Sequence, residues 1–344
     1  MNGWYARPGA RDWTCSPVRH GVREFHAALP GYAPTALTEL PALAEELGVG
    51  RVLVKDESTR LGLPAFKALG ASWAIHQILS RRPDAEPVRL VTATDGNHGR
   101  AVARMARLFG QRAHVFTAEG VHPAAVAAIA AEGAQVTQVD GTYDEAVHRA
   151  ATAAEEPGAV LVQDTAWPGY EETPSWIVEG YSTLFAEIDE QLGRPDLMVV
   201  PAGVGSLAQA AVTHYRSGAA QATALLAVEP DTAACVLASL IRGEPVTVET
   251  GETIMAGLNC GTPSSLAWPY LRDGLDAAVA VTDDDSARAV RDLTGLGVLA
   301  GPCGGAALAG ARSVLTGEHA SHLGTGPRST VVLLSTEGAE ANPS

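Results

Sequence analysis

The chain has 344 residues, of which 46% are hydrophobic and 18% charged, the composition of a folded globular protein long enough for two α/β domains. Its formal net charge of −15 opposes binding to phosphate backbones, so no nucleic-acid partner is expected. We see neither an apolar run long enough for a bilayer nor a secretory signal, and therefore expect a cytoplasmic protein with no membrane partner.

Short apolar segments alternate with segments of helical periodicity along the chain, and this alternation predicts βαβ units with mostly parallel sheets. The expected strands span residues 88–93, 113–118, 135–140, 159–164, 197–202, 224–229, 277–282 and 330–335. The expected helices span residues 98–109, 123–132, 143–155, 174–192, 205–217 and 303–315, and one more begins near Ala65. Thr142 followed by Glu145 resembles a capping box at the start of a helix.

Four of these strands end in polar or glycine-rich turns that lead toward a helix. The turns are TDGNHG at 94–99, QDTAW at 163–167, AGVGS at 202–206 and STEG at 335–338. In open α/β sheets, ligands bind beyond the carboxyl ends of the strands. The four turns are therefore expected to surround one crevice.

Lysine occurs at only two positions, Lys55 and Lys67, and the other 22 of the 24 basic residues (24 minus 2) are arginine. Arginine cannot form an imine, because its guanidinium stays protonated. One explanation is that a lysine is kept because the reaction needs its amine. The other is that GC-rich coding reduced the number of lysines and two remain by chance. Lys67 follows Phe66 at a helix start, so partial burial is expected to favour its free amine. The alternative is a lysine whose tip is solvated.

Gly203 and Gly205 lie between an apolar strand and a helix, where backbone N–H groups and a helix N-terminus can bind an anion. The segment also fits the pattern G-x-G-x-x-A, with Ala208 as its last residue. Glu229 follows at roughly the spacing of the ribose-binding carboxylate in dinucleotide folds. A nicotinamide-dependent oxidoreductase therefore remains an alternative to another phosphate-bearing cofactor.

Asp95 and Asp164 each follow a predicted strand, and together they could serve as acid and base on two sides of a substrate. Asn97 could bond a cofactor hydroxyl. The structural alternatives are a helix cap for Asp95 or Asn97 and a turn satisfied by backbone amides for Asp164. His98 is interpreted as a packing residue. The four cysteines are far apart and no second histidine stands at metal spacing from His98, so no metal site is expected.

Taken together, these motifs resemble the diaminopropionate ammonia-lyase group of the fold type II, threonine dehydratase-like pyridoxal-phosphate enzymes. The motifs that carry the resemblance run from about Tyr32 to Gly338 and include KDESTRLGLPAFKALG, ATDGNHGRAVA, VQDTAWPGYEETPSWIVEGY, PAGVGSLAQA, MAGLNCGTPSSLAWP and LLSTEG. The resemblance implies a two-domain α/β fold like that of the tryptophan synthase β-subunit, with a mostly parallel sheet flanked by helices in each domain. We expect residues 1–88 and 167–344 to form the large cofactor-binding domain and residues 89–166 to form an inserted small domain.

The resemblance also implies a role for each matching residue. Lys67 matches the Schiff-base lysine, and Asn97 matches the asparagine that bonds the phenolic oxygen of pyridoxal 5′-phosphate. Asp95 and Asp164 match the carboxylates that abstract the substrate proton from the D- and L-isomer, respectively. The phosphate loop is matched by Gly203, Val204, Gly205, Ser206 and Leu207, and the group facing the pyridine nitrogen by Ser335 or Thr336. The chain departs from the family pattern at Leu61, Pro64, Pro302 and Cys303.

The implied reaction is β-elimination of ammonia from 2,3-diaminopropionate or a close analogue through an aminoacrylate, giving pyruvate and ammonia. The alternatives on the same scaffold are a serine or threonine dehydratase and a β-replacement synthase. A catalytically silent binding protein is expected to have lost Lys67, which this chain retains. The implied partner is a small amino acid, and the implied assembly is a homodimer.

Overall fold

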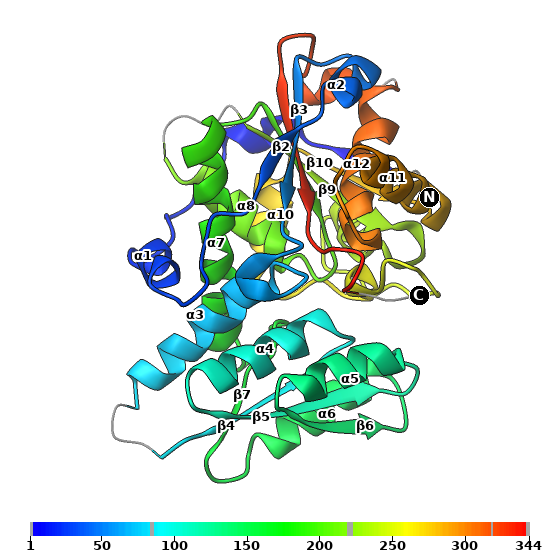
Figure 1. Cartoon of the computed structure of the whole chain (residues 1–344). Coiled ribbons are helices and arrows are strands. Elements are labelled where there is room, and N and C mark those ends of the chain that lie inside the picture. Colours follow the sequence, from blue (N-terminus) through cyan, green and yellow to red (C-terminus); the bar gives the residue numbers. More distant parts are fainter. Residues whose placement is uncertain (1–2, 83–85, 219–222, 318, 342–344) are drawn as a thin grey trace.

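The computed structural model describes residues 3–82, 86–218, 223–317 and 319–341. Within them the strands form two sheets, one below the other in Figure 1. The larger, seven-stranded sheet has the order β1 (Trp4–Ala6), β10 (Ala277–Val281), β9 (Ala224–Pro230), β8 (Leu197–Pro201), β11 (Thr330–Ser335), β3 (Arg51–Asp56), β2 (Leu37–Glu39). The four-stranded sheet has the order β6 (Gln135–Val139), β5 (Arg112–Ala118), β4 (Arg89–Ala93), β7 (Ala159–Leu161).

Both sheets are mostly parallel, as predicted. Every pairing within the small sheet is parallel, and in the larger sheet the edge strands β1 and β2 pair antiparallel with their neighbours. The eight predicted strands are confirmed, although β7 ends at Leu161, three residues before its predicted end. The strands β1, β2 and β3 are additions that the sequence did not predict. All strands of the small sheet lie between residues 89 and 161, inside the predicted insertion, whose boundaries stay a prediction.

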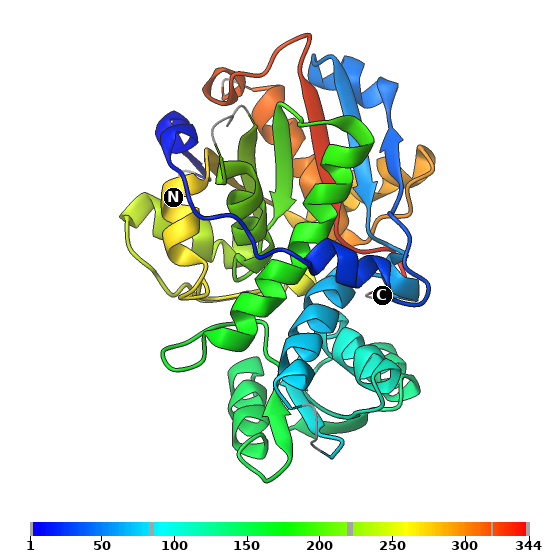
Figure 2. The same ribbon diagram turned by 90° about the vertical axis from the view of Figure 1, so that its left-hand side faces the viewer.

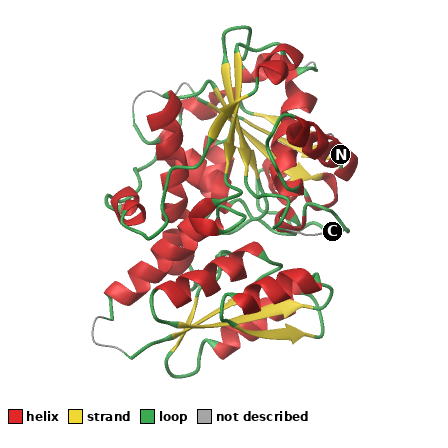
Figure 3. Cartoon of the chain, viewed as in Figure 1, coloured by secondary structure: helices red, strands yellow, loops and turns green. Residues whose placement is uncertain are grey.

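Helices cover both faces of the larger sheet (Figure 3). The helices of the described ranges are α1 (Val22–Ala27), α2 (Pro41–Leu47), α3 (Lys67–Ser80), α4 (Asn97–Leu108), α5 (Pro123–Ala131), α6 (Tyr143–Ala153), α7 (Glu172–Leu192), α8 (Ser206–Arg216), α9 (Cys235–Arg242), α10 (Trp268–Gly274), α11 (Asp283–Gly295), α12 (Pro302–Leu315) and α13 (Ala320–Leu323). Of these, α4, α5 and α6 pack on the small sheet. The capping box of Thr142 and Glu145 at the start of α6 is confirmed. In the described ranges no helix combines the length and apolarity needed to cross a bilayer.

Successive side chains of a strand point to opposite faces of the sheet, so the core is divided between the two faces of the larger sheet. In β8, Met198 and Val200 pack with α3, α7 and α8, whereas Leu197 and Val199 pack with α2 and α12. The first of these clusters continues through α3 and α4 to Leu90 of the small sheet. One continuous apolar cluster therefore joins both sheets through the helix that begins at Lys67.

Helices α3 and α7 lie side by side where the two sheets meet (Figures 1 and 2), and their closest approach is made by two glycines. A Cβ atom at Gly180 would lie 2.5 Å from the carbonyl oxygen of Leu69 and 2.8 Å from Cα of Gly70. A Cβ at Gly70 would lie 2.9 Å from the carbonyl oxygen of Ile177. No side chain fits between these backbones, so the glycines determine how near α3 comes to α7.

The other lysine has a structural role. Lys55 on β3 is fully buried, and its Nζ donates to Oε2 of Glu187 on α7 at 2.7 Å. Arg60 pairs with the same carboxylate at 2.7 Å. A buried carboxylate with two cations and several hydrogen bonds is a satisfied network, in which loss of a single partner would be costly. Of the two lysines, Lys55 is therefore engaged in the core.

Substituting Gly180 with alanine is expected to lower the free energy of unfolding by about 1–3 kcal/mol, because the added methyl must force α3 away from α7. Urea denaturation followed by circular dichroism measures this change. Gly295→Ala, near the end of α11 where an added Cβ meets nothing within 4 Å, is the matched control and is expected to leave stability unchanged or slightly higher. Equal stability of the two variants would contradict the close contact.

Candidate active site

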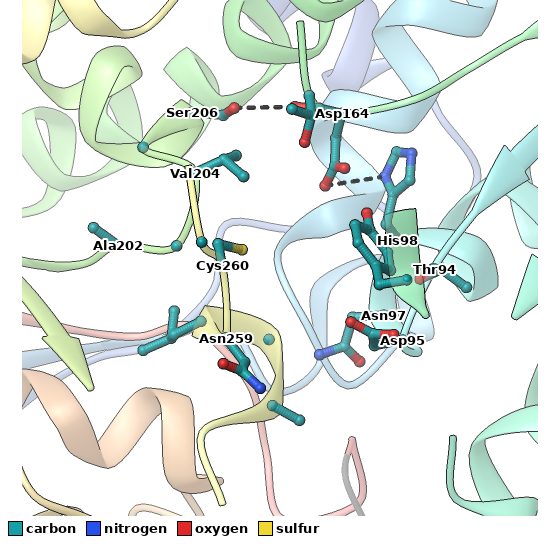
Figure 4. A pocket seen from close by; sticks show the side chains of 18 of the residues that line it. Thr94, Asp95, Asn97, His98, Asp164, Ala202, Val204, Ser206, Asn259 and Cys260 are labelled. Atoms are coloured by element: carbon teal, nitrogen blue, oxygen red, sulfur yellow. Dashed lines mark hydrogen bonds and ion pairs between the residues drawn. The ribbon is translucent and has the colours of Figure 1, made fainter. Parts of the chain in front are cut away.

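The four turns identified in the sequence surround one cavity of about 530 Å³, as predicted. The start of α3, the start of α6, residues 256–262 and Cys303 also line it. The predicted site residues that line it are Lys67, Asp95, Asn97, Asp164, Gly203, Val204, Gly205, Ser206, Leu207 and Thr336. The carboxyl ends of strands from both sheets thus meet at one place, and Figure 4 shows this cavity from close by.

Lys67 is the first residue of α3, and its Nζ lies 2.6 Å from Oδ2 of Asp164. Its side chain is 20% exposed, so the alternative of a solvated tip is wrong. The expectation that burial favours the free amine of Lys67 is also wrong. Burial lowers the pKa of Lys67, but the Asp164 carboxylate more than compensates and raises it above its ordinary value. Lys67 and Asp164 therefore form an ion pair across the cavity wall.

Asp95 and Asn97 are not the cap of α4. The hydroxyl of Thr94 takes that place, accepting from the backbone N–H groups of Gly96 at 3.0 Å and Gly99 at 3.1 Å. Both predicted site residues are therefore left to face the cavity. Asn97 Nδ2 donates to Oε2 of Glu337 at 2.6 Å, which holds its amide across the junction between the two sheets.

The two aspartates have opposite pKa shifts. Burial, together with the nearby charge of Asp164, raises the pKa of Asp95 to about 6. Burial also acts to raise the pKa of Asp164, but His98 and the ammonium of Lys67 hold it below its ordinary range. A pair of carboxyl groups with separated pKa values is what acid and base roles in one site require. The alternative in which backbone amides alone satisfy Asp164 is wrong, because Lys67 bonds it.

The loop 203–207 forms the opposite wall, at the N-terminus of α8. Gly205 has φ 94°, a left-handed conformation that favours glycine. At Gly203 the constraint is space, since a Cβ there would lie 2.9 Å from Sγ of Cys260 and 3.3 Å from the carbonyl oxygen of Gly257. The first N–H groups of a helix lack partners within the helix, so this loop can bind an anion. Ser206 Oγ donates to the carbonyl oxygen of Asp164 at 3.1 Å and links the loop to the turn after β7.

Ser335 and Thr336, which the sequence could not distinguish, have different surroundings. Thr336 lines the cavity, and its buried Oγ1 has no hydrogen-bond partner among the described residues. Ser335 is buried away from the cavity lining, with its Oγ 3.5 Å from the carbonyl oxygen of Glu337. Thr336 therefore offers a free hydroxyl to a bound group, and Ser335 does not.

Glu229 does not have the position that a dinucleotide site requires. It is fully buried and accepts hydrogen bonds from the backbone N–H groups of Val236 at 2.8 Å and Leu237 at 2.7 Å, at the start of α9. It lies outside the cavity lining. The interpretation of Glu229 as a ribose ligand is therefore wrong, because its carboxylate is already satisfied by a helix N-terminus.

Several residues of the cavity wall were not predicted. Glu337 bonds both Asn97 and the backbone N–H of Cys303, the latter at 3.2 Å. Tyr143 accepts from Nε2 of Gln163 at 2.9 Å and also lines the cavity. The signal for Glu337 was its place in the turn after β11, but nothing in the sequence singled out Tyr143. Among the family departures, Cys303 lines the cavity and Leu61, Pro64 and Pro302 do not.

The sequence pattern of the family described as pyridoxal-phosphate dependent enzyme matches residues 28–337. The chain belongs to this family. A member of the pyridoxal-phosphate-dependent enzymes takes pyridoxal 5′-phosphate as its cofactor, so the nicotinamide alternative is wrong.

Two curated relatives are diaminopropionate ammonia-lyases. The protein of Salmonella typhimurium is 39% identical over 303 residues, covering 80% of this chain and 75% of the relative. That of Escherichia coli K12 is 38% identical over 293 residues, covering 79% and 74%. The serine racemase of Bos taurus is 30% identical over 229 residues, with 64% of each chain covered.

Solved structures are similar over nearly the whole chain. The Escherichia coli diaminopropionate ammonia-lyase in complex with an aminoacrylate-PLP azomethine reaction intermediate has a TM-score of 0.84 and 34% identity, covering 93% of this chain and 88% of that one. The same lyase in complex with D-serine has a TM-score of 0.86 and 32% identity, covering 99% and 92%. Maize serine racemase, at 24% identity and a TM-score of 0.82, shares the fold. These comparisons confirm the fold type II architecture.

The residues present fit pyridoxal phosphate. The cavity has an amine at Lys67, a glycine cradle at a helix N-terminus for the phosphate, and an unpartnered buried hydroxyl on Thr336. These three groups match, in turn, the aldehyde, the phosphate and the pyridine nitrogen of the cofactor. A neutral hydroxyl beside the ring nitrogen would leave the ring less electron-withdrawing than a carboxylate partner, which stabilises a protonated nitrogen.

Gly203→Ala is expected to weaken binding of pyridoxal phosphate by roughly tenfold or more, which is about 1.4 kcal/mol. The new methyl would press against Sγ of Cys260 and the carbonyl oxygen of Gly257, so the cradle would have to shift. Titration of cofactor-depleted protein with pyridoxal phosphate, followed by near-visible absorbance, measures the affinity. Gly9→Ala, where an added Cβ meets nothing within 4 Å, is the control. Unchanged affinity of the Gly203 variant would place the phosphate elsewhere.

Proposed function

We propose that the protein is a diaminopropionate ammonia-lyase that converts 2,3-diaminopropionate and water into pyruvate and two molecules of ammonia. The observation that carries the proposal is the presence of Lys67, Asp95 and Asp164 around one cavity. The similarity to curated diaminopropionate ammonia-lyases along about four fifths of the chain supports it.

Bound through Lys67, pyridoxal phosphate supplies the electron sink that acidifies the Cα–H bond of an amino acid. The chain supplies position and proton transfer. The loop 203–207 would hold the phosphate, Asn97 would hold the phenolic oxygen, and Thr336 would hold the ring nitrogen. The ionised carboxylate of Asp164 or Asp95 takes the Cα proton. Lys67, which lies 2.6 Å from Asp164, protonates the departing amine.

Two carboxylates allow one cavity to accept both stereoisomers. Asp95 follows β4 and Asp164 follows β7, so they come from neighbouring strands of the small sheet. A substrate held by its cofactor presents the Cα proton in opposite directions for the D- and L-isomer. In our proposal Asp95 serves the D-isomer and Asp164 serves the L-isomer. A homodimer and a cytoplasmic location, which the resemblance and composition led us to expect, belong to the same proposal.

The direct test is to incubate the purified holoenzyme with D- and L-2,3-diaminopropionate, serine and threonine and to measure 2-oxo acid and ammonia. We expect pyruvate with two equivalents of ammonia from diaminopropionate, and no product from the Lys67→Ala variant. Faster turnover of serine or threonine would instead identify a dehydratase. Pyruvate formation that persists undiminished in the Lys67 variant would exclude the role of Lys67.

Asp95→Asn is expected to reduce turnover of the D-isomer by about 10²-fold or more and to spare the L-isomer, and Asp164→Asn is expected to do the reverse. Because the pKa of Asp95 is raised to about 6, its basic form is lost as the pH falls through 6. The kcat/KM of the wild type for the D-isomer should therefore decline below pH 6. Stopped assays from pH 5 to 9 measure both effects, and equal losses for both isomers in either variant would refute the division of labour.

A further inference from the structure

The carboxylate of Glu337 connects two helix starts in the cavity wall. Glu337 lies in the turn after β11, is 2% exposed and lines the cavity. Its Oε2 accepts from Nδ2 of Asn97 at the start of α4, at 2.6 Å. Its Oε1 accepts from the backbone N–H of Cys303 at the start of α12, at 3.2 Å. Each carboxylate oxygen therefore has a donor, and the two donors come from opposite sides of the junction between the sheets.

The backbone of the same turn is fixed to the segment just before Lys67. The N–H of Phe66 donates to the carbonyl oxygen of Thr336 at 3.2 Å. Glu337 itself forms an antiparallel bridge with the strand-like segment that precedes Phe66. The carboxylate that holds Asn97 is therefore carried by the turn that also holds the start of α3.

The hydrogen bond to Glu337 determines how the amide of Asn97 is oriented. A carboxylate accepts hydrogen bonds, so the NH₂ group of the amide must face it and the amide oxygen must face away. One hydrogen of that NH₂ group is used by Glu337. The second can donate to an acceptor in the cavity, into which Asn97 points (Figure 4).

The role proposed for Asn97 is to bond the phenolic oxygen of pyridoxal phosphate. That oxygen needs a donor, and an amide oxygen in the same place would repel it. We propose that Glu337 is a positioning residue, which holds the Asn97 amide with its second N–H available to the phenolic oxygen and thereby strengthens cofactor binding. This inference rests on the role that the proposed function gives to Asn97.

Glu337→Gln would invert the orientation of Asn97 while keeping the groups around it hydrogen-bonded. The oxygen of glutamine can accept from the N–H of Cys303, and its NH₂ group then points at Asn97. The Asn97 amide must turn its oxygen toward this new donor. The fold loses no hydrogen bond in this exchange. The NH₂ group that could donate to the phenolic oxygen is, however, replaced by an oxygen that can only accept.

The test measures cofactor affinity and stability separately. We expect Glu337→Gln to weaken binding of pyridoxal phosphate to the cofactor-depleted protein by about tenfold, followed by near-visible absorbance. The urea midpoint of the cofactor-free variant should match that of wild type. Glu155→Gln removes a carboxylate from the exposed surface outside the cavity lining and is expected to change neither quantity. Unchanged cofactor affinity of the Glu337 variant would overturn the proposal.

A double variant shows whether Glu337 acts through Asn97, whatever the stability of the single variants. Asn97→Ala alone is expected to weaken cofactor binding by about tenfold. If Glu337 acts through Asn97, adding Glu337→Gln to Asn97→Ala changes the affinity by no more than about twofold. Independent effects would multiply to about a hundredfold and would overturn the proposal. Should Glu337→Gln not fold, Glu337→Asp, whose shorter side chain withdraws the carboxylate from Asn97, enters the same comparison.

Failure of this inference can be distinguished from failure of the proposed function. An Asn97→Ala variant that binds pyridoxal phosphate as tightly as wild type would refute the role of Asn97, on which the inference rests. A wild type that binds the cofactor but releases no ammonia from diaminopropionate would refute the proposed reaction. The affinities of the Glu337 and Asn97 variants would still decide the role of Glu337 in that case, because they are measured without substrate.

Discussion

The contact between α3 and α7 sets the distance on which the active site depends. Lys67 opens α3, and Asp164 lies a few residues before α7, so the spacing of these helices determines how far apart the amine and the carboxylate lie. Gly70 and Gly180 remove the side chains that would otherwise separate the two backbones. A cofactor amine and its acid–base partner must be held within tenths of an ångström, and a backbone contact between helices is a stiffer spacer than any pair of flexible side chains.

The two sheets contribute different parts of the chemistry to the cavity between them. The larger sheet brings the groups suited to holding a cofactor, namely the amine of Lys67, the cradle at 203–207 and the hydroxyl of Thr336. The small sheet brings the groups suited to moving protons, Asp95 and Asp164. Such a division separates the groups that can hold a cofactor from those that can move protons, and similar proteins include both ammonia-lyases and a serine racemase.

Most of the regular structure could be predicted because its signals are local. Eight strands and the main helices follow from apolar periodicity, but β1 and β2 have only three residues each and leave too short a pattern. β3 was missed although it is longer, because its apolar core is only three residues between charged ends. The cavity itself was predictable, since it forms where parallel strands end. The contact of His98 with the carbonyl oxygen of Val162 was not, because Val162 is 64 residues away in the sequence.

By itself the sequence determined the fold class, the cofactor and the motifs that approach it, because glycine turns, strand ends and a rare lysine are properties of short segments. Only the tertiary structure decided which of two lysines faces the cavity, that Thr336 rather than Ser335 offers a free hydroxyl, and that Glu229 caps a helix. It also reversed the expected charge state of Lys67, whose pKa depends on a carboxylate 97 residues away. Burial and partnership arise from contacts between distant segments, and these contacts exist only when the chain is folded.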